Sequence, residues 1–414
     1  MERGNDDRIG CGPMTLALPV IALMLACGIS EVKQDAGKEP VIDELELPDR
    51  AVCCVTGVEF PSGYDWNKHE EGGEVKSSLV VFADAVPCLK VPVGAGFEVS
   101  GDPDMNRFLE GNLYSFYSDD GVSSIKKNGS PLYRYDADEI LLDMLVKGED
   151  LYILTRKVEG GFSCRKNASV ILEKFSGEAF GRLWEDDGCV CFAYMQPVAV
   201  SDGMEARYYV VRDSDVMHVP FKKEVVRVWD IMSKNGEPCC LVSISYDVKT
   251  YLVRGSQYKA VEIPASACML SCRLFDANGR IGVECVYESG TSDMEGGIWI
   301  EGSEYLRFEV GRQISYLCCG DGKVCCVMNP EESGGSVVSK GMIYDGENLH
   351  DMPEGYFCTG VSPASVFQGE LYVALSSRSG ERPVVWHDGQ LDTLKMHGYV
   401  SSVEIVNQGP SPYK

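Results

Sequence analysis

The chain has 414 residues, with 38 lysines and arginines against 63 aspartates and glutamates, and a formal net charge of −25. Because this charge repels phosphate backbones, we expect no nucleic-acid partner. The apolar residues, 44% of the chain, are enough to bury a sizeable core, and the 44 glycines among strand-forming residues indicate many short strands and turns. No long stretch has the apolar spacing of a helix, so the predicted fold class is all-β.

An apolar run of thirteen residues, Met14–Ala26, lies near the start of the chain and ends directly before Cys27. It has the length of a signal-peptide core and is shorter than the roughly 20 residues that a membrane-spanning helix needs. Met24–Cys27 resembles the lipobox of bacterial lipoproteins. The resemblance implies a signal peptide over residues 1–26 and a palmitate-type lipid on Cys27 that anchors the protein in a membrane. The alternative is a buried apolar strand that ends at an incidental cysteine.

Residues 27–48 are polar, charged and poor in aromatic side chains, which is typical of a flexible tether. Together with the lipobox, this segment indicates an outer-membrane lipoprotein of a bacterial cell envelope. Lipoproteins of Bacteroidetes-type bacteria often carry an acidic surface-export signal just after the cysteine, and Ser30 and Glu31 resemble it faintly. The sequence leaves open whether the protein faces the periplasm or the cell surface.

A glycine that opens a strand recurs along most of the chain, at intervals of 37 to 48 residues. Clear copies begin at Gly111, Gly188, Gly322 and Gly369, and looser copies begin at Gly148, Gly236 and Gly279. A second pattern, an apolar strand followed by Asp-Gly or a related turn, accompanies the first. Its clear copies are Ile298–Gly302, Met342–Gly346 and Val385–Gly389, its fair copies are Tyr251–Gly255 and Ile125–Gly129, and its weak copies are Val81–Ala85, Leu172–Ser176 and Val211–Ser214.

These two patterns predict small antiparallel sheets, because Asp-Gly supplies the positive φ values that a two-residue hairpin turn needs. A sheet of about 43 residues cannot bury both of its faces alone, and closing a ring of such sheets avoids exposed ends. We therefore predict a single β-propeller of four-stranded blades over residues 49–408, followed by a tail at 409–414. Eight blades are predicted, or seven if one weak copy is not a repeat unit. A pair of β-sandwiches or a six-bladed ring fits the repeat less well.

The two ends of the predicted domain complement each other. Val52–Val58 reads as a second strand with no first strand before it, and Tyr399–Val406 reads as a first strand with no second strand after it. We expect them to complete one blade together, as is common in propellers. The repeats resemble those of propeller lipoproteins of Bacteroidetes-type bacteria, which carry a similar aromatic-x-Asp-Gly turn. This motif is short, so the resemblance bears on the fold more than on the function.

The spacer between the second and third strands varies most among the units. In a propeller these connections gather on one face, where binding loops are common. The first spacer contains Tyr64, Trp66 and His69, a combination of aromatic and polar side chains that suits a carbohydrate or a peptide. We predict these three residues as a loop-face binding site, and the alternative is ordinary loop composition.

The sequence contains no recognisable catalytic, cofactor-binding or metal-binding motif. Its five histidines, His69, His218, His350, His387 and His397, do not have the spacing of metal ligands. The eighteen cysteines include four adjacent pairs, at 53–54, 239–240, 318–319 and 325–326. Neighbours in a strand point to opposite faces and rarely bond each other, so we expect mainly small core residues. An exported chain would also form cross-strand disulfides, but no pairing can be assigned from the sequence.

The predicted function is that of a monomeric, lipid-anchored protein that binds an unknown protein or carbohydrate ligand through its propeller loops, without catalysis. One alternative is a carbohydrate-active enzyme with paired carboxylates in the central funnel. A second alternative, which rests on fold analogy alone, is an outer-membrane assembly factor.

Overall fold

The computed structural model describes residues 52–61, 77–92, 106–119, 122–136, 139–201, 203–222, 224–244, 247–263, 268–288, 294–308, 314–333, 336–360, 362–377 and 382–406. All of them belong to the second of two compact units, Glu44–Lys414. The predicted signal peptide, Cys27 and the tether lie outside the described residues. Within the described ranges every regular element is a β-strand. A search of the same ranges finds no helix with the length and apolarity needed to cross a membrane.

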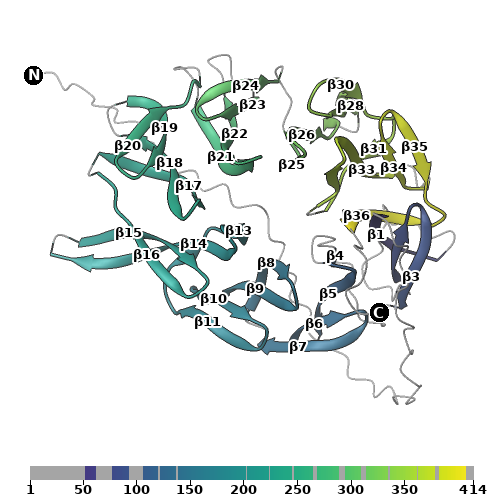
Figure 1. Ribbon diagram of the computed structural model, residues 1–414, viewed down its shortest axis with the longest axis horizontal. Coiled ribbons are helices and arrows are strands. Elements are labelled where there is room, and N and C mark those ends of the chain that lie inside the picture. The colour runs from purple at the N-terminus through teal and green to yellow at the C-terminus, as the bar shows by residue number, and fades with distance from the viewer. Residues whose placement is uncertain are drawn as a thin grey trace, which may run out of the picture. The chain divides into compact units, whose positions relative to one another are not determined.

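Eight antiparallel sheets of four or five strands follow one another around a ring, and each sheet is one blade of a β-propeller (Figure 1). The blade that closes the ring contains β36 (Gly398–Val406), β1 (Val52–Glu59), β2 (Ser78–Ala83) and β3 (Val86–Pro92). The second blade contains β4 (Asn106–Leu109), β5 (Asn112–Asp119), β6 (Val122–Lys127) and β7 (Ser130–Asp136). The third contains β8 (Glu139–Lys147), β9 (Asp150–Lys157), β10 (Phe162–Lys166) and β11 (Ser169–Lys174). The prediction of eight blades is confirmed.

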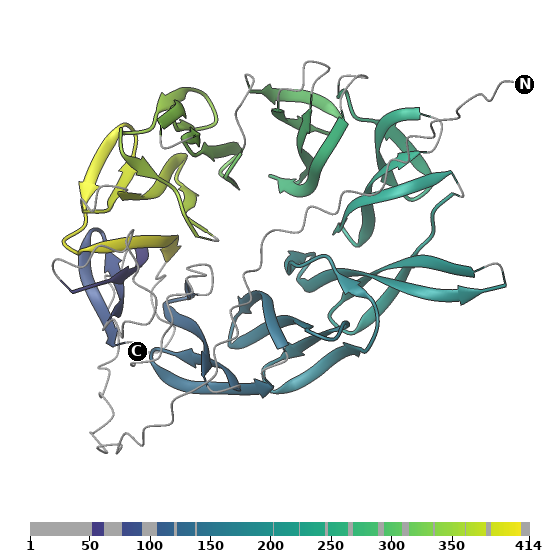
Figure 2. The same cartoon turned by 180° about the vertical axis from the view of Figure 1, so that it is seen from behind.

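The remaining blades continue around the ring in chain order, as the view from behind also shows (Figure 2). The fourth contains β12 (Glu178–Ala179), β13 (Trp184–Asp186), β14 (Cys189–Val200), β15 (Gly203–Arg212) and β16 (Asp215–Val219). The fifth contains β17 (Val225–Lys234), β18 (Glu237–Ile244), β19 (Asp247–Arg254) and β20 (Gln257–Ala260), and the sixth contains β21 (Cys268–Ala277), β22 (Arg280–Glu288), β23 (Met294–Ile300) and β24 (Ser303–Arg307). The seventh contains β25 (Tyr316–Gly320), β26 (Lys323–Met328), β29 (Met342–Tyr344) and β30 (Leu349–Asp351), and the eighth contains β31 (Tyr356–Phe357), β32 (Ala364–Phe367), β33 (Glu370–Ser377), β34 (Val384–His387) and β35 (Gln390–Thr393).

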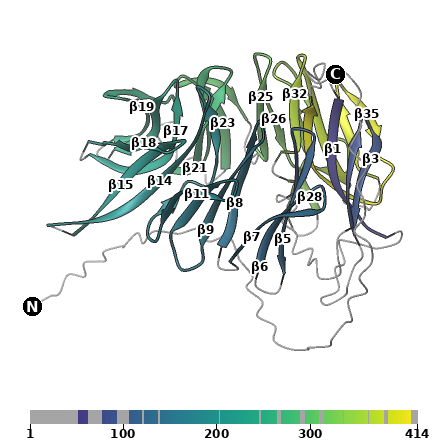
Figure 3. The ribbon, with the colours of Figure 1, turned by 60° about the horizontal axis from the view of Figure 1, so that its bottom comes forward.

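Three details depart from a plain repeat of four strands. The first strand is broken into two pieces in the fourth and eighth blades, where β12 and β13, and β31 and β32, pair with different parts of one neighbour. The spacer of the seventh blade forms an extra hairpin, β27 (Glu331–Ser333) with β28 (Ser336–Ser339). The β14–β15 hairpin is the longest and extends outward from the ring (Figure 3).

The ring closes by pairing strands from the two ends of the domain. Strand β36 pairs antiparallel with β1, from Val52 opposite Val406 to Glu59 opposite Gly398, which confirms the predicted joint blade. Gly57 is needed at this contact because a Cβ atom there would lie 2.6 Å from the carbonyl oxygen of Tyr399. The closing blade therefore depends on a pairing between residues more than three hundred positions apart in the sequence.

The two repeated sequence patterns contact each other inside the blades. Each glycine of the first pattern has a positive φ angle in the hairpin that joins the first and second strands. Near the start of the second strand, a backbone N–H donates to the side chain of the residue that begins the turn between the third and fourth strands, and this residue returns a backbone hydrogen bond. Such reciprocal pairs join Asn128 with Leu113, Asn167 with Leu151, Asp213 with Val190, Glu301 with Ile281 and Asp84 with Cys53. We call this arrangement the turn lock.

The weak copy of the second pattern at Leu172–Ser176 was assigned wrongly. The turn of the third blade lies instead at Asn167, between β10 and β11, and Leu172 belongs to the fourth strand. The turn has asparagine followed by alanine there, so the Asp-Gly signal is absent, although asparagine tolerates the left-handed conformation and has φ of 52°.

The core consists of apolar clusters that each join two neighbouring blades. In one cluster Leu241 and Leu252 of the fifth blade pack with Val283 and Trp299 of the sixth, and all four are buried. In another, Cys325 and Val327 of the seventh blade pack with residues of the eighth. Because each blade covers a face of the next, no sheet exposes both of its apolar faces, which is the physical reason for the ring.

Substitutions of Asp213 are expected to separate two contributions to the turn lock, the side-chain hydrogen bond and the tolerance of a positive φ angle. Asp213 has φ of 50° and its carboxylate accepts the Val190 N–H at 3.0 Å. Asp213→Asn keeps the acceptor and should change the free energy of unfolding by less than about 0.5 kcal/mol. Asp213→Gly loses the hydrogen bond and should cost about 1 kcal/mol, whereas Asp213→Ala also strains the backbone and should cost about 2–3 kcal/mol. Urea unfolding measures the order, and equal losses for alanine and glycine would contradict the assigned backbone strain.

Candidate functional site

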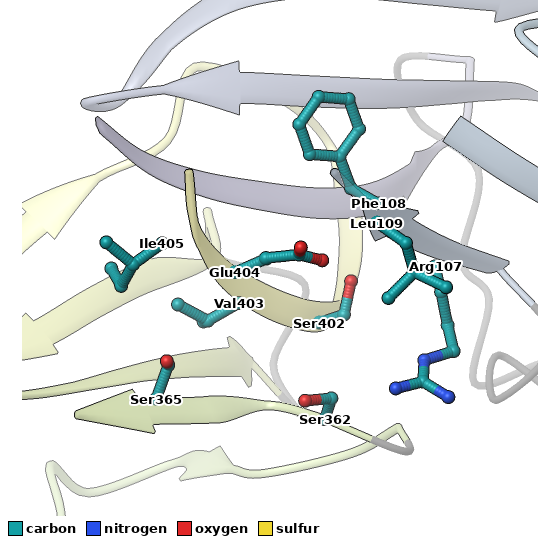
Figure 4. Close-up of a pocket in the computed structure, with 9 residues that line it drawn as sticks. All are labelled: Arg107, Phe108, Leu109, Ser362, Ser365, Ser402, Val403, Glu404 and Ile405. Atoms are coloured by element: carbon teal, nitrogen blue, oxygen red, sulfur yellow. The ribbon is translucent and has the colours of Figure 1, made fainter. Parts of the chain in front are cut away.

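A pocket of about 210 Å³ lies where the closing blade meets its neighbours at the inner strands of the ring. Its wall comes from β4, from β36 and from the segment that contains β32 (Figure 4). We call it the seam pocket, because β36 brings the C-terminal part of the domain against strands near its start. The lining residues are Arg107, Phe108, Leu109, Ser362, Ser365, Ser402, Val403, Glu404 and Ile405.

Small side chains create the space. Ser362, Ser365 and Ser402 come from two neighbouring inner strands, and their short hydroxymethyl groups leave room that larger side chains would fill. Ser362 and Ser402 form an isolated parallel bridge, and the Val403 N–H donates to the Ser362 carbonyl oxygen at 2.7 Å. The Ser362 hydroxyl lies 3.2 Å from the Tyr316 hydroxyl. The wall is therefore fixed by backbone and side-chain hydrogen bonds.

Ser402 contributes a hydroxyl that the protein leaves unpaired. The residue is 4% exposed, and its Oγ has no hydrogen-bond partner among the described residues. A buried hydroxyl without a partner costs about 1–3 kcal/mol, so it favours binding of a polar group that can complete its hydrogen bonds. Ser402 therefore offers a hydrogen-bonding group that a polar ligand or a water molecule could complete.

Glu404 lies two residues further along β36, on the same face of the strand as Ser402. Its carboxyl group points toward β4 (Figure 4) and accepts the backbone N–H of Glu110 at 3.0 Å. Burial raises the pKa of Glu404 to about 7, and the hydrogen bond from Glu110 and the charge of Arg107 oppose this rise only in part. Near neutral pH the group can therefore either donate or accept a proton in a hydrogen bond.

Arg107 lines the pocket but its charge is already balanced. Its Nη1 donates to Asp143 Oδ1 at 3.1 Å and to the Met144 carbonyl oxygen at 2.7 Å. Asp143 in turn accepts the Leu183 N–H at 2.7 Å, so one carboxylate ties the second, third and fourth blades together. Burial raises the pKa of Asp143, and Arg107 opposes that effect. The guanidinium group of Arg107 therefore lines one side of the pocket, but Asp143 neutralises its charge.

The same interaction recurs two blades further around the ring. Asp230 accepts hydrogen bonds from Arg182 Nη2 at 2.6 Å and from the Leu274 N–H at 2.7 Å, which joins the fourth, fifth and sixth blades. Burial raises the pKa of Asp230 as well, again against the charge of its arginine. Because the arrangement repeats away from the pocket, we assign Asp143 and Asp230 to holding blades together rather than to ligand binding.

The sequence-predicted site residues are not tested by the structure. Tyr64, Trp66, His69 and Cys27 all lie outside the described residues. Among the described histidines, His387 lies in the turn region of the eighth blade, where its Nε2 is 3.1 Å from Asp392 Oδ2 and its ring stacks on Tyr372. Within the described ranges, no three histidine, cysteine, aspartate or glutamate side chains are arranged to hold a metal ion.

The sequence interpretation missed the seam pocket. The one available signal was an acidic residue between two apolar neighbours in a first strand, as with Glu404 between Val403 and Ile405. Asp143 and Asp230 show the same pattern, and each coincides with a β-bulge in β8 or β17. Sequence alone does not distinguish the carboxylates that join blades from the one that lines a pocket.

Strand pairing and ring closure define this chain as a β-propeller protein. No family model matches the sequence, and no curated protein matches it either. Similar solved structures include the β-propeller domain of the Trilobed protease from Pyrococcus furiosus, at 13% identity over 72% of this chain and 93% of that chain, with a TM-score of 0.44. They also include the Pyrococcus horikoshii acylaminoacyl peptidase, at 11% identity over 73% of this chain and 51% of that chain, with a TM-score of 0.44.

Oligogalacturonate lyase from Vibrio parahaemolyticus is similar as well, at 10% identity over 82% of this chain and 98% of that chain, with a TM-score of 0.42. These similarities concern the fold alone. They carry no information on the activity of this chain.

The parent protein is expected to lose stability as the pH rises from about 4.5 to about 7, and Glu404→Gln should remove most of this loss. Because the pKa of Glu404 is higher in the folded than in the unfolded chain, the folded protein binds more protons in this window, and its free energy of unfolding falls as the pH rises. Glutamine stays uncharged and keeps an oxygen for the Glu110 N–H, so the fall should shrink by on the order of 2 kcal/mol. Urea unfolding across the window measures it. The exposed Glu237→Gln serves as the control, and identical pH profiles for parent and Glu404→Gln would contradict the prediction.

Proposed function

We propose that this protein is a lipid-anchored, non-catalytic binding protein of a bacterial cell envelope, and that its seam pocket receives an uncharged polar group of the ligand. The observation that supports the pocket most strongly is the buried, unpaired hydroxyl of Ser402 beside Glu404 and Arg107. The seam pocket is proposed in addition to the predicted loop-face site at Tyr64, Trp66 and His69.

The charges around the pocket favour a neutral ligand group. Arg107 is compensated by Asp143, and Glu404 is partly protonated near neutral pH because burial raises its pKa to about 7. A bound carboxylate would meet an acidic surface and a bound amine would meet a guanidinium group. Hydroxyl and amide groups can instead accept from arginine and can both donate to and accept from serine and a partly protonated glutamate.

The size of the pocket indicates that it takes one group of a larger ligand. Its volume of about 210 Å³ is smaller than the roughly 300–1,000 Å³ of sites that enclose a drug-sized molecule. An N-acetylated sugar carries hydroxyl and amide groups on one compact ring, so a carbohydrate is the ligand class that fits both criteria. The acidic chain, with a net charge of −25, remains an unsuitable partner for nucleic acid.

One observation favours an enzyme as the second candidate. A carboxyl group with a pKa of about 7 in a pocket has the property of a general acid. Glycoside hydrolysis, however, needs a second carboxyl group at about 5–10 Å, and Glu404 is the one carboxylate among the residues that line the seam pocket. Asp143 and Asp230 are also buried carboxylates on inner strands, but both already accept hydrogen bonds from arginines and backbone N–H groups. Binding is therefore the better-supported function.

The anchor and the location rest on the sequence. Met14–Ala26 has the length of a signal-peptide core, and Met24–Cys27 resembles a lipobox. With Cys27 acylated, residues 27–48 would tether the propeller to the outer membrane. Anchoring would hold a monomeric propeller near envelope glycans or near a partner protein.

Ser402→Val is expected to weaken the binding of N-acetylated sugars to the seam pocket. Valine removes the unpaired hydroxyl and fills part of the space, so the affinity for chitin oligosaccharides should fall at least about tenfold. Titration calorimetry of the full chain measures it. Ser303→Val, on the exposed outer strand β24, is the matched control and should bind like the parent. The sugar-binding proposal fails if the parent does not bind, or if Ser402→Val binds as tightly as the parent.

Protease shaving of intact cells, beside a Cys27→Ser control, tests the anchor and the side of the membrane. We expect the parent to fractionate with the outer membrane and the Cys27→Ser variant to be released from it, because the acyl chain supplies the membrane affinity. Cleavage in intact cells would indicate a surface-exposed propeller, and cleavage only after the outer membrane is opened would indicate a periplasmic one. If the Cys27→Ser variant fractionates like the parent, the lipoprotein proposal is wrong.

A further inference from the structure

Two cysteines face each other in the seventh blade. Cys318 on β25 lies directly opposite Cys325 on β26, in a hairpin whose turn is formed by Asp321 and Gly322. Counting pairs from this turn makes Cys318 and Cys325 a hydrogen-bonded pair of the ladder, for which opposed Cα atoms are about 5.5 Å apart. A disulfide requires Cα atoms about 4.4–6.8 Å apart, so the register allows a direct bond.

The neighbouring blade contains a disulfide in the corresponding hairpin. Cys272 on β21 and Cys285 on β22 are also directly opposed and are bonded, with Cα atoms 4.3 Å apart. They lie further from their turn than Cys318 and Cys325 and form a non-hydrogen-bonded pair of the ladder, in which opposed Cα atoms are closer. Both hairpins join the first and second strands of their blades. A disulfide between the first and second strands of a blade is therefore compatible with the propeller fold.

The surroundings of the pair distinguish the two thiols. Cys325 is completely buried in the cluster between the seventh and eighth blades, whereas Cys318 is half-buried on the inner strand. A hydrogen bond with Cys325, together with burial, raises the pKa of Cys318. Cys318 is therefore the thiol of the pair that a small reagent in solution reaches first.

The adjacent cysteines provide an internal comparison. Cys319 and Cys326 belong to the opposite face of the hairpin, in the cluster between the sixth and seventh blades. Cys319 lies opposite Val324, and Cys326 lies opposite Leu317, so neither has a cysteine directly across the ladder. Four cysteines of one hairpin therefore contain a single directly opposed pair.

We propose that Cys318 and Cys325 are a redox-active dithiol that closes to a disulfide by exchange with a low-molecular-weight disulfide such as oxidised glutathione. The Cys318 thiolate attacks one sulfur of the reagent, which breaks its disulfide bond, forms a mixed disulfide and releases one glutathione thiolate. The Cys325 thiolate then attacks the Cys318 sulfur and releases the second glutathione. The two protein protons pass to the two glutathione thiolates, so the protein dithiol is oxidised as the reagent is reduced.

The location of the pair gives the proposed reaction a connection to the seam pocket. Tyr316 lies two residues before Cys318, on the same face of β25, and its hydroxyl is 3.2 Å from that of Ser362 in the pocket wall. The proposal itself does not depend on the proposed function, since it concerns the chemistry of the hairpin alone.

Peptide mapping of the purified full chain tests the proposal. The protein is reduced and dialysed into a buffer of oxidised and reduced glutathione, its free thiols are alkylated, and it is digested with trypsin, which cleaves after Lys323 between the two cysteines. We expect peptides 313–323 and 324–340 to be joined, and to separate on reduction. Peptides 260–273 and 281–307, which contain the Cys272–Cys285 bond, report whether the conditions restore a disulfide at all.

Single substitutions assign the link. Cys319→Ser and Cys326→Ser should retain it, whereas Cys318→Ser should lose it. If Cys318→Ser does not fold, fragmentation of the linked peptides from the parent assigns the bond to Cys318 or Cys319. Free thiols at 318 and 325 in a sample whose Cys272–Cys285 bond has re-formed would overturn the proposal, as would a link that runs through Cys319.

Discussion

The turn lock is the interaction on which each blade depends. A second strand of six to twelve residues has little local preference for its partner, and a shift by one residue would turn its apolar side chains to the wrong face. In the turn lock, the side chain that begins the turn between the third and fourth strands accepts an N–H at the start of the second strand, and its own N–H returns the bond. This pair fixes the register of three strands at one point, and the same geometry recurs in five blades.

The turn lock also explains why the sequence repeat is degenerate. Its first requirement is a residue with a side-chain oxygen and tolerance of positive φ at the start of the turn between the third and fourth strands. Its second requirement is a backbone N–H group at the start of the second strand that has no other acceptor. Asparagine, aspartate and glutamate all meet the first requirement in this chain, at Asn128, Asp213 and Glu301. The second requirement is met by the backbone and leaves no trace in the sequence. A repeat defined by hydrogen bonds in this way can change most of its letters and keep its structure.

Much of the fold could be predicted, because its constraints are local. Glycines with positive φ, alternating apolar positions and a spacing of about 43 residues predict hairpins, sheets and a ring, and the unmatched strands at the two ends predict the closing blade. The seam pocket could not be predicted, since Arg107 and Ser402 come from distant parts of the chain and nothing local distinguishes their strands. Leu172–Ser176 was assigned wrongly for a related reason, because its pattern of apolar residues matched while the hydrogen-bonding residue, Asn167, lay five positions earlier.

The closing blade differs from the others in how its first strand is held. In the other seven blades a short turn with a glycine joins the first and second strands, whereas β36 and β1 meet only through long-range pairing. This blade keeps a turn lock between Asp84 and Cys53, but no short turn fixes its first strand against its second. Backbone bonds from Val403 to Ser362 and from Glu110 to Glu404 hold it instead. The seam pocket lies along this strand, where distant partners replace a local turn.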